Sequence, residues 1–134
     1  MKKSCLCQNI VIEFTNGDAF NLARKCNCNY CVSKNAEYVS NPKELISFKV
    51  IDKEKRTIVK HGYRSADFHE CVNYGLVLVT SVIEDDAYCV LNAKVLGIEG
   101  YTLDPQARDF SEESINARLA RRKSNWSPVH ENHN

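Results

Sequence analysis

Three cysteines lie within six consecutive positions of this chain, in the segment Cys26-Asn27-Cys28-Asn29-Tyr30-Cys31. One bend of backbone can direct three thiols with this Cys-x-Cys-x-x-Cys spacing toward a single centre. Zinc takes four ligands, and a site with three protein ligands leaves one position for water or a substrate. The spacing therefore predicts a metal centre with Cys26, Cys28 and Cys31 as its ligands.

The charge of such a centre indicates which fourth ligand it would accept. A zinc ion with three thiolates carries a formal charge of about minus one, so it polarises bound water weakly and favours a soft ligand such as another thiolate. Lys25 and Lys34 flank the cluster and would offset part of this charge. The main alternative is a structural site closed by a fourth residue from elsewhere in the chain, and a disulfide is a further alternative.

Length, cysteine count and charge limit the classes of protein to consider. The 134 residues predict one domain, 1–134, with a core over about 4–110 and a helix and tail over 111–134. Seven cysteines, an odd number with two Cys-x-Cys spacings, favour metal-bound thiolates in a reducing compartment over a secreted disulfide scaffold. With 18 basic and 17 acidic side chains, no overall charge attracts nucleic acid or a membrane. Neither a signal peptide nor a membrane-length apolar run is visible. We therefore expect a cytoplasmic protein that binds neither nucleic acid nor a membrane.

Patterns of apolar and β-branched residues predict a mostly β chain. The expected strands are 10–14, 20–23, 36–40, 48–51, 57–60, 68–71, 76–79 and 88–91. Cys89, in the last of these strands, is expected to be a buried thiol without a metal.

Turn signals predict how these strands pair. Asn16-Gly17 favours a type I′ turn, which would pair 10–14 with 20–23 and bring Cys26 toward Cys5 and Cys7. The strand 48–51 is expected to pair with 57–60 across a charged turn. A further hairpin is expected between 68–71 and 76–79, with Cys71 near its tip.

The pattern becomes helical near the C-terminus, with Asp109 as the expected N-cap and Glu112 three residues on. Trp126 is expected to pack the helix onto the body, and Pro128 to prevent its continuation. The helix carries a basic cluster, read either as a solvated helix end or as a source of one arginine that reaches an anionic substrate. The cluster comprises Arg118, Arg121, Arg122 and Lys123. His130 and His133 are assigned to a polar tail without metal.

Three groups of residues occur here in a familiar order and spacing: Ser4-Cys5-Leu6-Cys7, Cys26-Asn27-Cys28-Asn29-Tyr30-Cys31, and Cys71-Val72-Asn73-Tyr74-Gly75. In these groups the chain resembles the GFA family, which comprises glutathione-dependent formaldehyde-activating enzymes and centromere protein V. The resemblance runs from Ser4 to about Leu96. The segments 36–42 and 111–128 are also similar to one bacterial branch of the family.

The resemblance implies several small coiled antiparallel sheets built around zinc-binding cysteine knuckles, with a short C-terminal helix and two zinc positions. By the family pattern, Cys26, Cys28 and Cys31 hold the zinc associated with catalysis. The structural zinc would be held by Cys5, Cys7 and Cys71.

Tyr74 stands where the family pattern places the fourth structural cysteine. A phenol is a poor ligand at neutral pH because its pKa is about 10. His69 is a possible replacement. It lies two residues before Cys71, and on a strand this spacing places both side chains on the same face. A water, Cys89 or the absence of a structural metal are the other options.

The resemblance also implies a function, that of a carbon–sulfur lyase of the S-(hydroxymethyl)glutathione synthase type. Its partner would be a small thiol such as glutathione, and an open three-thiolate zinc suits a thiol ligand. Two alternatives remain: a non-enzymatic zinc module that binds a macromolecule, and a vestigial relative that binds metal weakly. The sequence identifies no general base and no oligomeric state.

Overall fold

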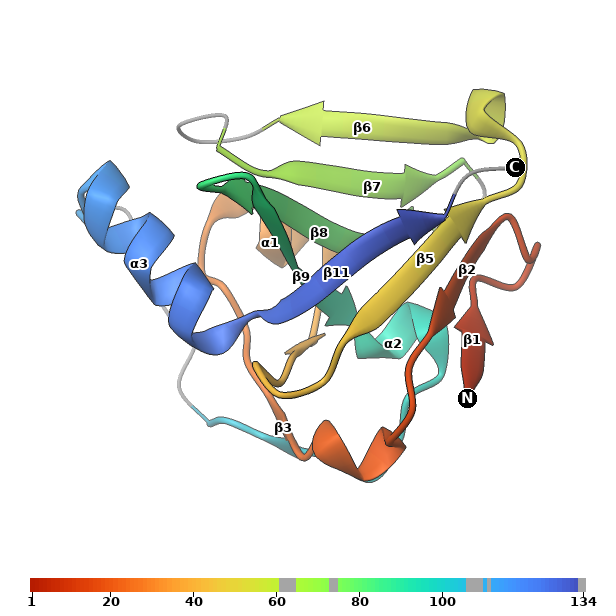
Figure 1. Ribbon diagram of the computed structural model, residues 1–134, viewed down its shortest axis with the longest axis horizontal. Coiled ribbons are helices and arrows are strands. Elements are labelled where there is room, and N and C mark those ends of the chain that lie inside the picture. The colour runs from red at the N-terminus through yellow and green to blue at the C-terminus, as the bar shows by residue number, and fades with distance from the viewer. Residues whose placement is uncertain (61–64, 73–74, 106–109, 111, 133–134) are drawn as a thin grey trace.

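The computed structural model describes residues 1–60, 65–72, 75–105, 110 and 112–132. The expected mostly β class with a C-terminal helix is confirmed (Figure 1). The strands are β1 (Lys2–Ser4), β2 (Ile10–Glu13), β3 (Leu22–Ala23), β4 (Tyr38–Val39), β5 (Ile46–Val50), β6 (Arg56–Lys60), β7 (Asp67–Cys71), β8 (Gly75–Ile83), β9 (Asp86–Asn92), β10 (Thr102–Leu103) and β11 (Ser127–Asn132). The helices are α1 (Asn29–Lys34), α2 (Ala93–Leu96) and α3 (Ile115–Asn125), with 3-10 turns η1 (Gly17–Ala19) and η2 (Lys53–Lys55).

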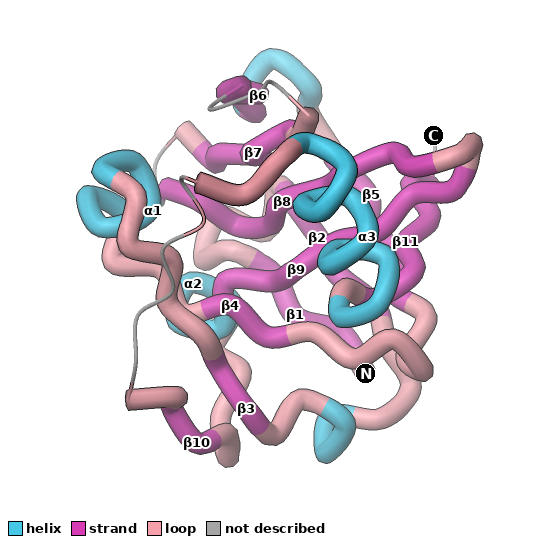
Figure 2. The backbone as a smooth tube through the Cα atoms, turned by 90° about the vertical axis from the view of Figure 1, so that its left-hand side faces the viewer, coloured by secondary structure: helices cyan, strands magenta, loops and turns pink. Residues whose placement is uncertain are grey.

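Most strands join one mixed sheet in the order β1-β2-β5-β11-β9-β8-β7-β6, and β4 pairs with β9 as its ninth strand. The pairings are antiparallel except for β11 with β5. β3 and β10 form a separate parallel pair at the lower end of the molecule in Figure 2. Antiparallel pairing thus predominates, as expected, but β11 links the strands into one mixed sheet instead of several small ones.

The segment expected to be a polar tail is a strand inside the sheet. β11 lies between β5 and β9, with Val129 opposite Ile46 and Ser127 opposite Cys89 (Figure 1). The Ser127 hydroxyl donates to the carbonyl oxygen of Asn41 at 2.8 Å and fixes the start of this strand. His130 is an exposed residue of β11, whereas His133 lies outside the described residues.

The hairpin expected between 10–14 and 20–23 is wrong. β2 pairs with β1 on one edge and with β5 on the other, while β3 pairs with β10. Asn16 is the reason, because its side chain caps η1 by accepting from the Asp18 backbone N–H at 3.0 Å. Buried Glu44 also accepts hydrogen bonds from the backbone N–H groups of residues 15 and 16. The chain therefore leaves the sheet here and does not carry Cys26 toward Cys5 and Cys7.

The expected pairing of 48–51 with 57–60 is also wrong. β5 pairs with β2 and β11, whereas β6 pairs with β7. The segment between β5 and β6 forms η2, with the Asp52 side chain accepting from the Glu54 N–H at 3.0 Å. The hairpin of β7 with β8 is confirmed, and Cys71 lies opposite Gly75 next to its tip.

The middle of β8 is buried on both faces, because Leu76, Val77, Leu78 and Val79 are all at most 2% exposed. Each such side chain stabilises the fold by about 1.5–3 kcal/mol relative to an exposed position. Val77 and Leu78 belong to the main core, whereas Leu76 and Val79 join a second cluster with Cys31, Tyr38, Phe68, Val90 and Trp126. The second cluster supports α1 and its cysteines.

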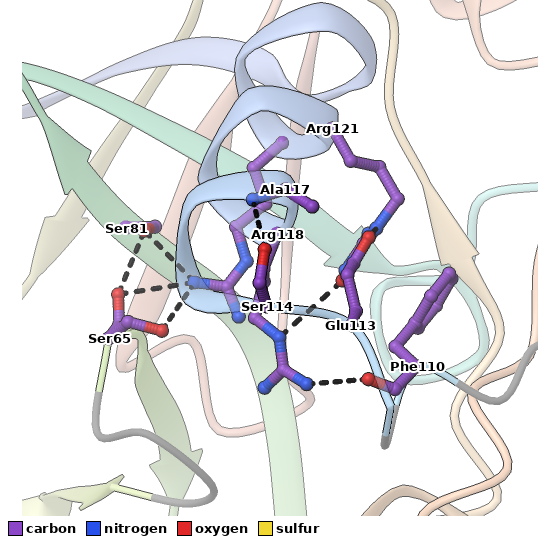
Figure 3. A network of polar contacts seen from close by, with 9 residues as sticks. Ser65, Ser81, Phe110, Glu113, Ser114, Ala117, Arg118 and Arg121 are labelled. Carbon is purple, nitrogen blue, oxygen red and sulfur yellow. Dashed lines mark hydrogen bonds and ion pairs between the residues drawn. The ribbon is translucent and has the colours of Figure 1, made fainter.

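The N-cap of α3 is Ser114, five positions after the expected Asp109. The Ser114 hydroxyl accepts from the Ala117 N–H at 3.1 Å (Figure 3). Asp109 lies outside the described residues. Trp126 ends the helix and is buried, as expected. No helix in the described part of the chain combines the length and apolarity required to span a bilayer.

The basic cluster of α3 is more than a solvated helix end. Arg121 forms a paired contact with the Glu113 carboxylate, at 3.0 and 3.1 Å, and lies over the Phe110 ring (Figure 3). Arg122 is buried, and its Nη1 donates to the hydroxyl of Ser65 at 2.9 Å. Lys123 does extend to the surface, where it meets Glu84.

Candidate metal centres

The six predicted ligand cysteines form two separate groups of three. One group is Cys26, Cys28 and Cys31, and the other is Cys5, Cys7 and Cys71. Within each group the sulfur atoms all lie within 4.8 Å of one another. Tetrahedral zinc with Zn–S distances of about 2.3 Å separates its sulfur ligands by about 3.8 Å. Both groups are therefore placed to bind a metal ion, with a donor set that suits zinc.

No disulfide joins any of the seven cysteines, all of which lie in the described ranges. Cys89 belongs to neither group and is fully buried in β9, as predicted. Burial also raises the pKa of its thiol, because the thiolate would be poorly solvated there. Cys89 is therefore a core residue and not the missing fourth ligand.

Helix capping brings the first group together. Cys28 is the N-cap of α1, and its sulfur accepts from the backbone N–H of Cys31 at 3.4 Å. A residue at the N-cap and one three positions later lie beside each other in this geometry. Asn35 then ends the helix in the left-handed conformation, at φ 50°. The short helix thus places Cys28 and Cys31 together, and the segment before it adds Cys26.

A buried phenol supports the inner sulfur of this group. The hydroxyl of Tyr38 lies 3.1 Å from the sulfur of Cys31, and both residues are less than 9% exposed. Burial and the nearby Cys31 raise the pKa of this phenol, so Tyr38 keeps its proton. It can therefore donate a hydrogen bond to a Cys31 thiolate. Tyr38 was not predicted as a site residue, because nothing in the spacing links position 38 on β4 to the cysteine cluster.

The three thiols of the first group differ in acidity. A hydrogen bond with Cys31 lowers the pKa of the Cys26 thiol, and the positive charge of Arg121 lowers it further. The same hydrogen bond, together with burial, raises the pKa of Cys31. Cys26 therefore loses its proton first. Arg121, from the distant helix α3, contributes positive charge where metal-bound thiolates would accumulate negative charge.

The outer side of α1 contacts β7 through Glu70. Tyr30 donates a hydrogen bond to the Glu70 carboxylate, and the Lys34 ammonium lies 3.2 Å from the same carboxylate. Lys25 instead donates to the side chain of Asn35 at 3.2 Å. The two lysines that flank the cluster thus fix the helix, and Lys34 has its own carboxylate partner. Only the three-dimensional arrangement places Glu70 at this site.

The second group forms where the turn after β1 meets the end of β7. The Cys7 sulfur lies 3.4 Å from Cys5 and 3.1 Å from Cys71. The turn is closed by a 2.9 Å hydrogen bond from the Gln8 N–H to the Cys5 carbonyl, and Gln8 has φ 60°. The contact with Cys71 lowers the pKa of the Cys7 thiol, and a hydrogen bond with the Asn9 backbone contributes. Cys5 and Cys71 are buried, whereas Cys7 is exposed.

His69 does not join this group as a replacement ligand. Its Nδ1 accepts from Arg56 at 3.1 Å, and its Nε2 lies 2.8 Å from the hydroxyl of Thr80. Burial, with a contribution from Arg56, lowers the pKa of His69 to about 4. Both ring nitrogens therefore already have partners outside the cysteine group. Tyr74 lies outside the described residues.

Neither group gains a fourth protein ligand from the described part of the chain. No further histidine, cysteine, aspartate or glutamate side chain among the described residues joins either set of three thiols. Cys26 and Cys28 are partly exposed. The arrangement can therefore hold a soft metal ion with three sulfurs and leave a coordination position for another molecule.

Comparison with known proteins supports the fold. No protein-family model matches the chain, and no curated protein matches it. A crystal structure of a Rhodobacter sphaeroides protein is similar, with a TM-score of 0.54 and 23% sequence identity. The similarity covers 81% of this chain and 99% of that one. At this level of identity the likeness shows a common fold and assigns no activity.

Proposed function

We propose that this protein is a GFA-like, zinc-dependent carbon–sulfur lyase that acts on the adduct of an aldehyde with glutathione or another thiol. S-hydroxymethylglutathione is the model substrate. The observation that carries the proposal is the group of Cys26, Cys28 and Cys31, with three converging sulfurs, two of them on partly exposed residues. The absence of a fourth ligand among the described residues favours an exchangeable position.

The proposed reaction is a reversible addition. In the synthetic direction the thiol S–H adds across the aldehyde C=O, so that a C–S bond forms and the thiol proton ends on the oxygen. In the lyase direction the hydroxyl proton returns to sulfur as the C–S bond breaks, and nothing is oxidised or reduced. Zinc, when bound, would hold the sulfur of the substrate as a thiolate. Holding two small reactants together supplies a further gain in rate.

The side chains around the first group have separate roles in this proposal. Cys26, Cys28 and Cys31 hold the ion, and the Tyr38 hydroxyl fixes and stabilises the inner thiolate. Arg121 is oriented by Glu113 and supplies positive charge near Cys26. This charge would attract an anionic thiol such as glutathione, which corresponds to the arginine role considered from the sequence.

The direct test uses cobalt-substituted protein titrated with glutathione, followed by exchange NMR of the formaldehyde adduct. We expect the cobalt absorption bands to change on addition of the thiol, and adduct formation to be faster than in buffer. Cys28→Ser should lose the acceleration of adduct formation, about one metal ion per chain, and the part of the cobalt response that comes from this group. Cys89→Ala is the matched control, because Cys89 is also a cysteine of the chain but lies in neither group.

A closed zinc module predicts the opposite result. If the cobalt absorption bands do not change with glutathione and adduct formation is no faster than in buffer, the proposed lyase is contradicted and a non-enzymatic role is favoured. Equal metal content in the native protein and in Cys28→Ser would exclude this group as a main metal site.

A further inference from the structure

The turn that carries Cys5 and Cys7 borders a cavity of about 190 Å³. Cys7 and Cys71 line this cavity, together with Asn9, Asp52, Lys55 and Val72. Because one water occupies about 30 Å³ in the liquid, the space could hold several waters or the sulfur end of a small molecule. Two of the three thiols of the second group therefore face an accessible space.

Hydrogen bonds fix the walls of this cavity. The Asn9 side chain donates to the Asp52 carbonyl at 3.1 Å and accepts from the Asp52 N–H at 2.7 Å. The Asn9 carbonyl also accepts from the Ile51 N–H at 2.8 Å, and the Lys55 carbonyl accepts from the Val72 N–H at 3.2 Å. The cysteine turn, η2 and the end of β7 are thus held to one another.

The described side chains nearest to this site have other roles. One oxygen of the Asp52 carboxylate caps η2, and both ring nitrogens of His69 have partners. No described histidine, cysteine, aspartate or glutamate joins Cys5, Cys7 and Cys71 as a fourth ligand. Zinc sites are commonly closed by a Cys-x-x-Cys pair, but the position three residues after Cys71 is Tyr74.

We propose that Cys5, Cys7 and Cys71 form a second open metal site, whose fourth position faces this cavity and binds a small external thiol. Three thiolates make the ion soft, which favours a further sulfur ligand over water. The half-exposed side chains of Ile51 and Val72 border the cavity and provide an apolar rim for the carbon part of such a ligand. The inference is independent of the reaction proposed for the first group.

The test is ¹¹³Cd NMR of the full chain loaded with ¹¹³Cd, in a phosphine reductant that contains no thiol. The resonance of the second site is identified by its loss in Cys7→Ser, a substitution at an exposed residue that leaves the core intact. Titration with 2-mercaptoethanol should move this resonance downfield to a limiting value as a fourth sulfur binds. The first site is followed separately through the resonance lost in Cys28→Ser, so failure of the two proposals is distinguishable.

Substitutions of Tyr74 provide the matched pair. Tyr74→Cys should close the site, so that its resonance is already downfield and the response to 2-mercaptoethanol is lost. Tyr74→Phe should keep both the native resonance and the native response. The proposal is overturned if the native protein binds only one cadmium ion, or if its second resonance ignores 2-mercaptoethanol. It is also overturned if Tyr74→Phe shifts that resonance before thiol is added, because the phenol would then be the fourth ligand.

Discussion

Removal of one oxygen atom, in Tyr38→Phe, tests how the first metal centre is supported. The Tyr38 hydroxyl lies 3.1 Å from the Cys31 sulfur in the second core cluster. A metal-bound Cys31 is a thiolate, which can accept but not donate a hydrogen bond. Tyr38 must therefore be the hydrogen-bond donor in the metal-bound protein. The substitution keeps the ring and its packing and removes only this hydrogen bond.

The expected loss is larger for metal binding than for folding. Outer partners of metal ligands typically contribute 10–100-fold to affinity, which corresponds to about 1.4–2.7 kcal/mol. In the metal-free protein the same contact joins a phenol to a neutral thiol. Its removal should then lower the free energy of unfolding by about 0.5–1.5 kcal/mol.

Competition with a chromophoric chelator measures the zinc affinity, and urea denaturation measures the stability of the metal-free protein. Tyr101→Phe is the matched control, because the Tyr101 hydroxyl donates its hydrogen bond to the Glu37 carboxylate, at 2.8 Å, and not to a cysteine. We expect the control to lose stability and to keep its zinc affinity. Equal zinc affinities for native protein and Tyr38→Phe would refute the proposed support of Cys31.

Three further predictions concern the fold. Burial opposes ionisation of Glu44, but hydrogen bonds from residues 15–16 outweigh this effect and hold the pKa of the carboxyl below its usual value. The ionised Glu44 therefore stabilises the folded state fully above the unfolded pKa of about 4.3, and this contribution is lost as pH falls through the folded pKa. Glu44→Gln should therefore cost about 1–3 kcal/mol at neutral pH and flatten the acid side of the stability profile measured by urea denaturation, and an unchanged profile would contradict this. Arg122 is buried against Trp126, and its Nε has no hydrogen-bond partner among the described residues. Arg122→Met should therefore change the free energy of unfolding by less than about 1 kcal/mol, whereas Arg122→Ala should lower it by about 2–4 kcal/mol. Equal losses in the two variants would show that the charge of Arg122 matters more than its packing. Cys89→Ala should lower the melting temperature and leave the metal content measured by atomic absorption unchanged; a loss of metal would assign Cys89 to a site.

Local patterns were sufficient for the strands from β2 to β9 and for the first group of cysteines. β8 is buried on both faces and has a continuous run of apolar residues, whereas β5 alternates between buried and partly exposed residues. Both patterns can be read directly from the sequence. The cysteines at positions 26, 28 and 31 converge because they are close in sequence and share a capped turn. The second group was predicted only through a family resemblance, because Cys7 and Cys71 lie 64 positions apart in the chain.

Contacts between distant residues decided the features that the sequence did not predict. Asn16-Gly17 has the composition of a hairpin turn, but Glu44 binds the preceding backbone and Asn16 caps η1 instead. β11 contains Pro128 and polar residues. It is nevertheless a strand, because it pairs with β5 on one side and with β9 on the other. The approach of Tyr38 and Arg121 to the cysteines likewise depends on how β4 and α3 pack.

Glu70 and Cys71 are neighbours on β7, yet they serve different centres. Glu70 holds α1 through Tyr30 and Lys34, whereas Cys71 contributes a sulfur to the other group. One peptide unit therefore lies between the residue that supports one cysteine group and a thiol of the other. Metal titrations of the two groups should for this reason be fitted together, with a coupling term that the data can set to zero.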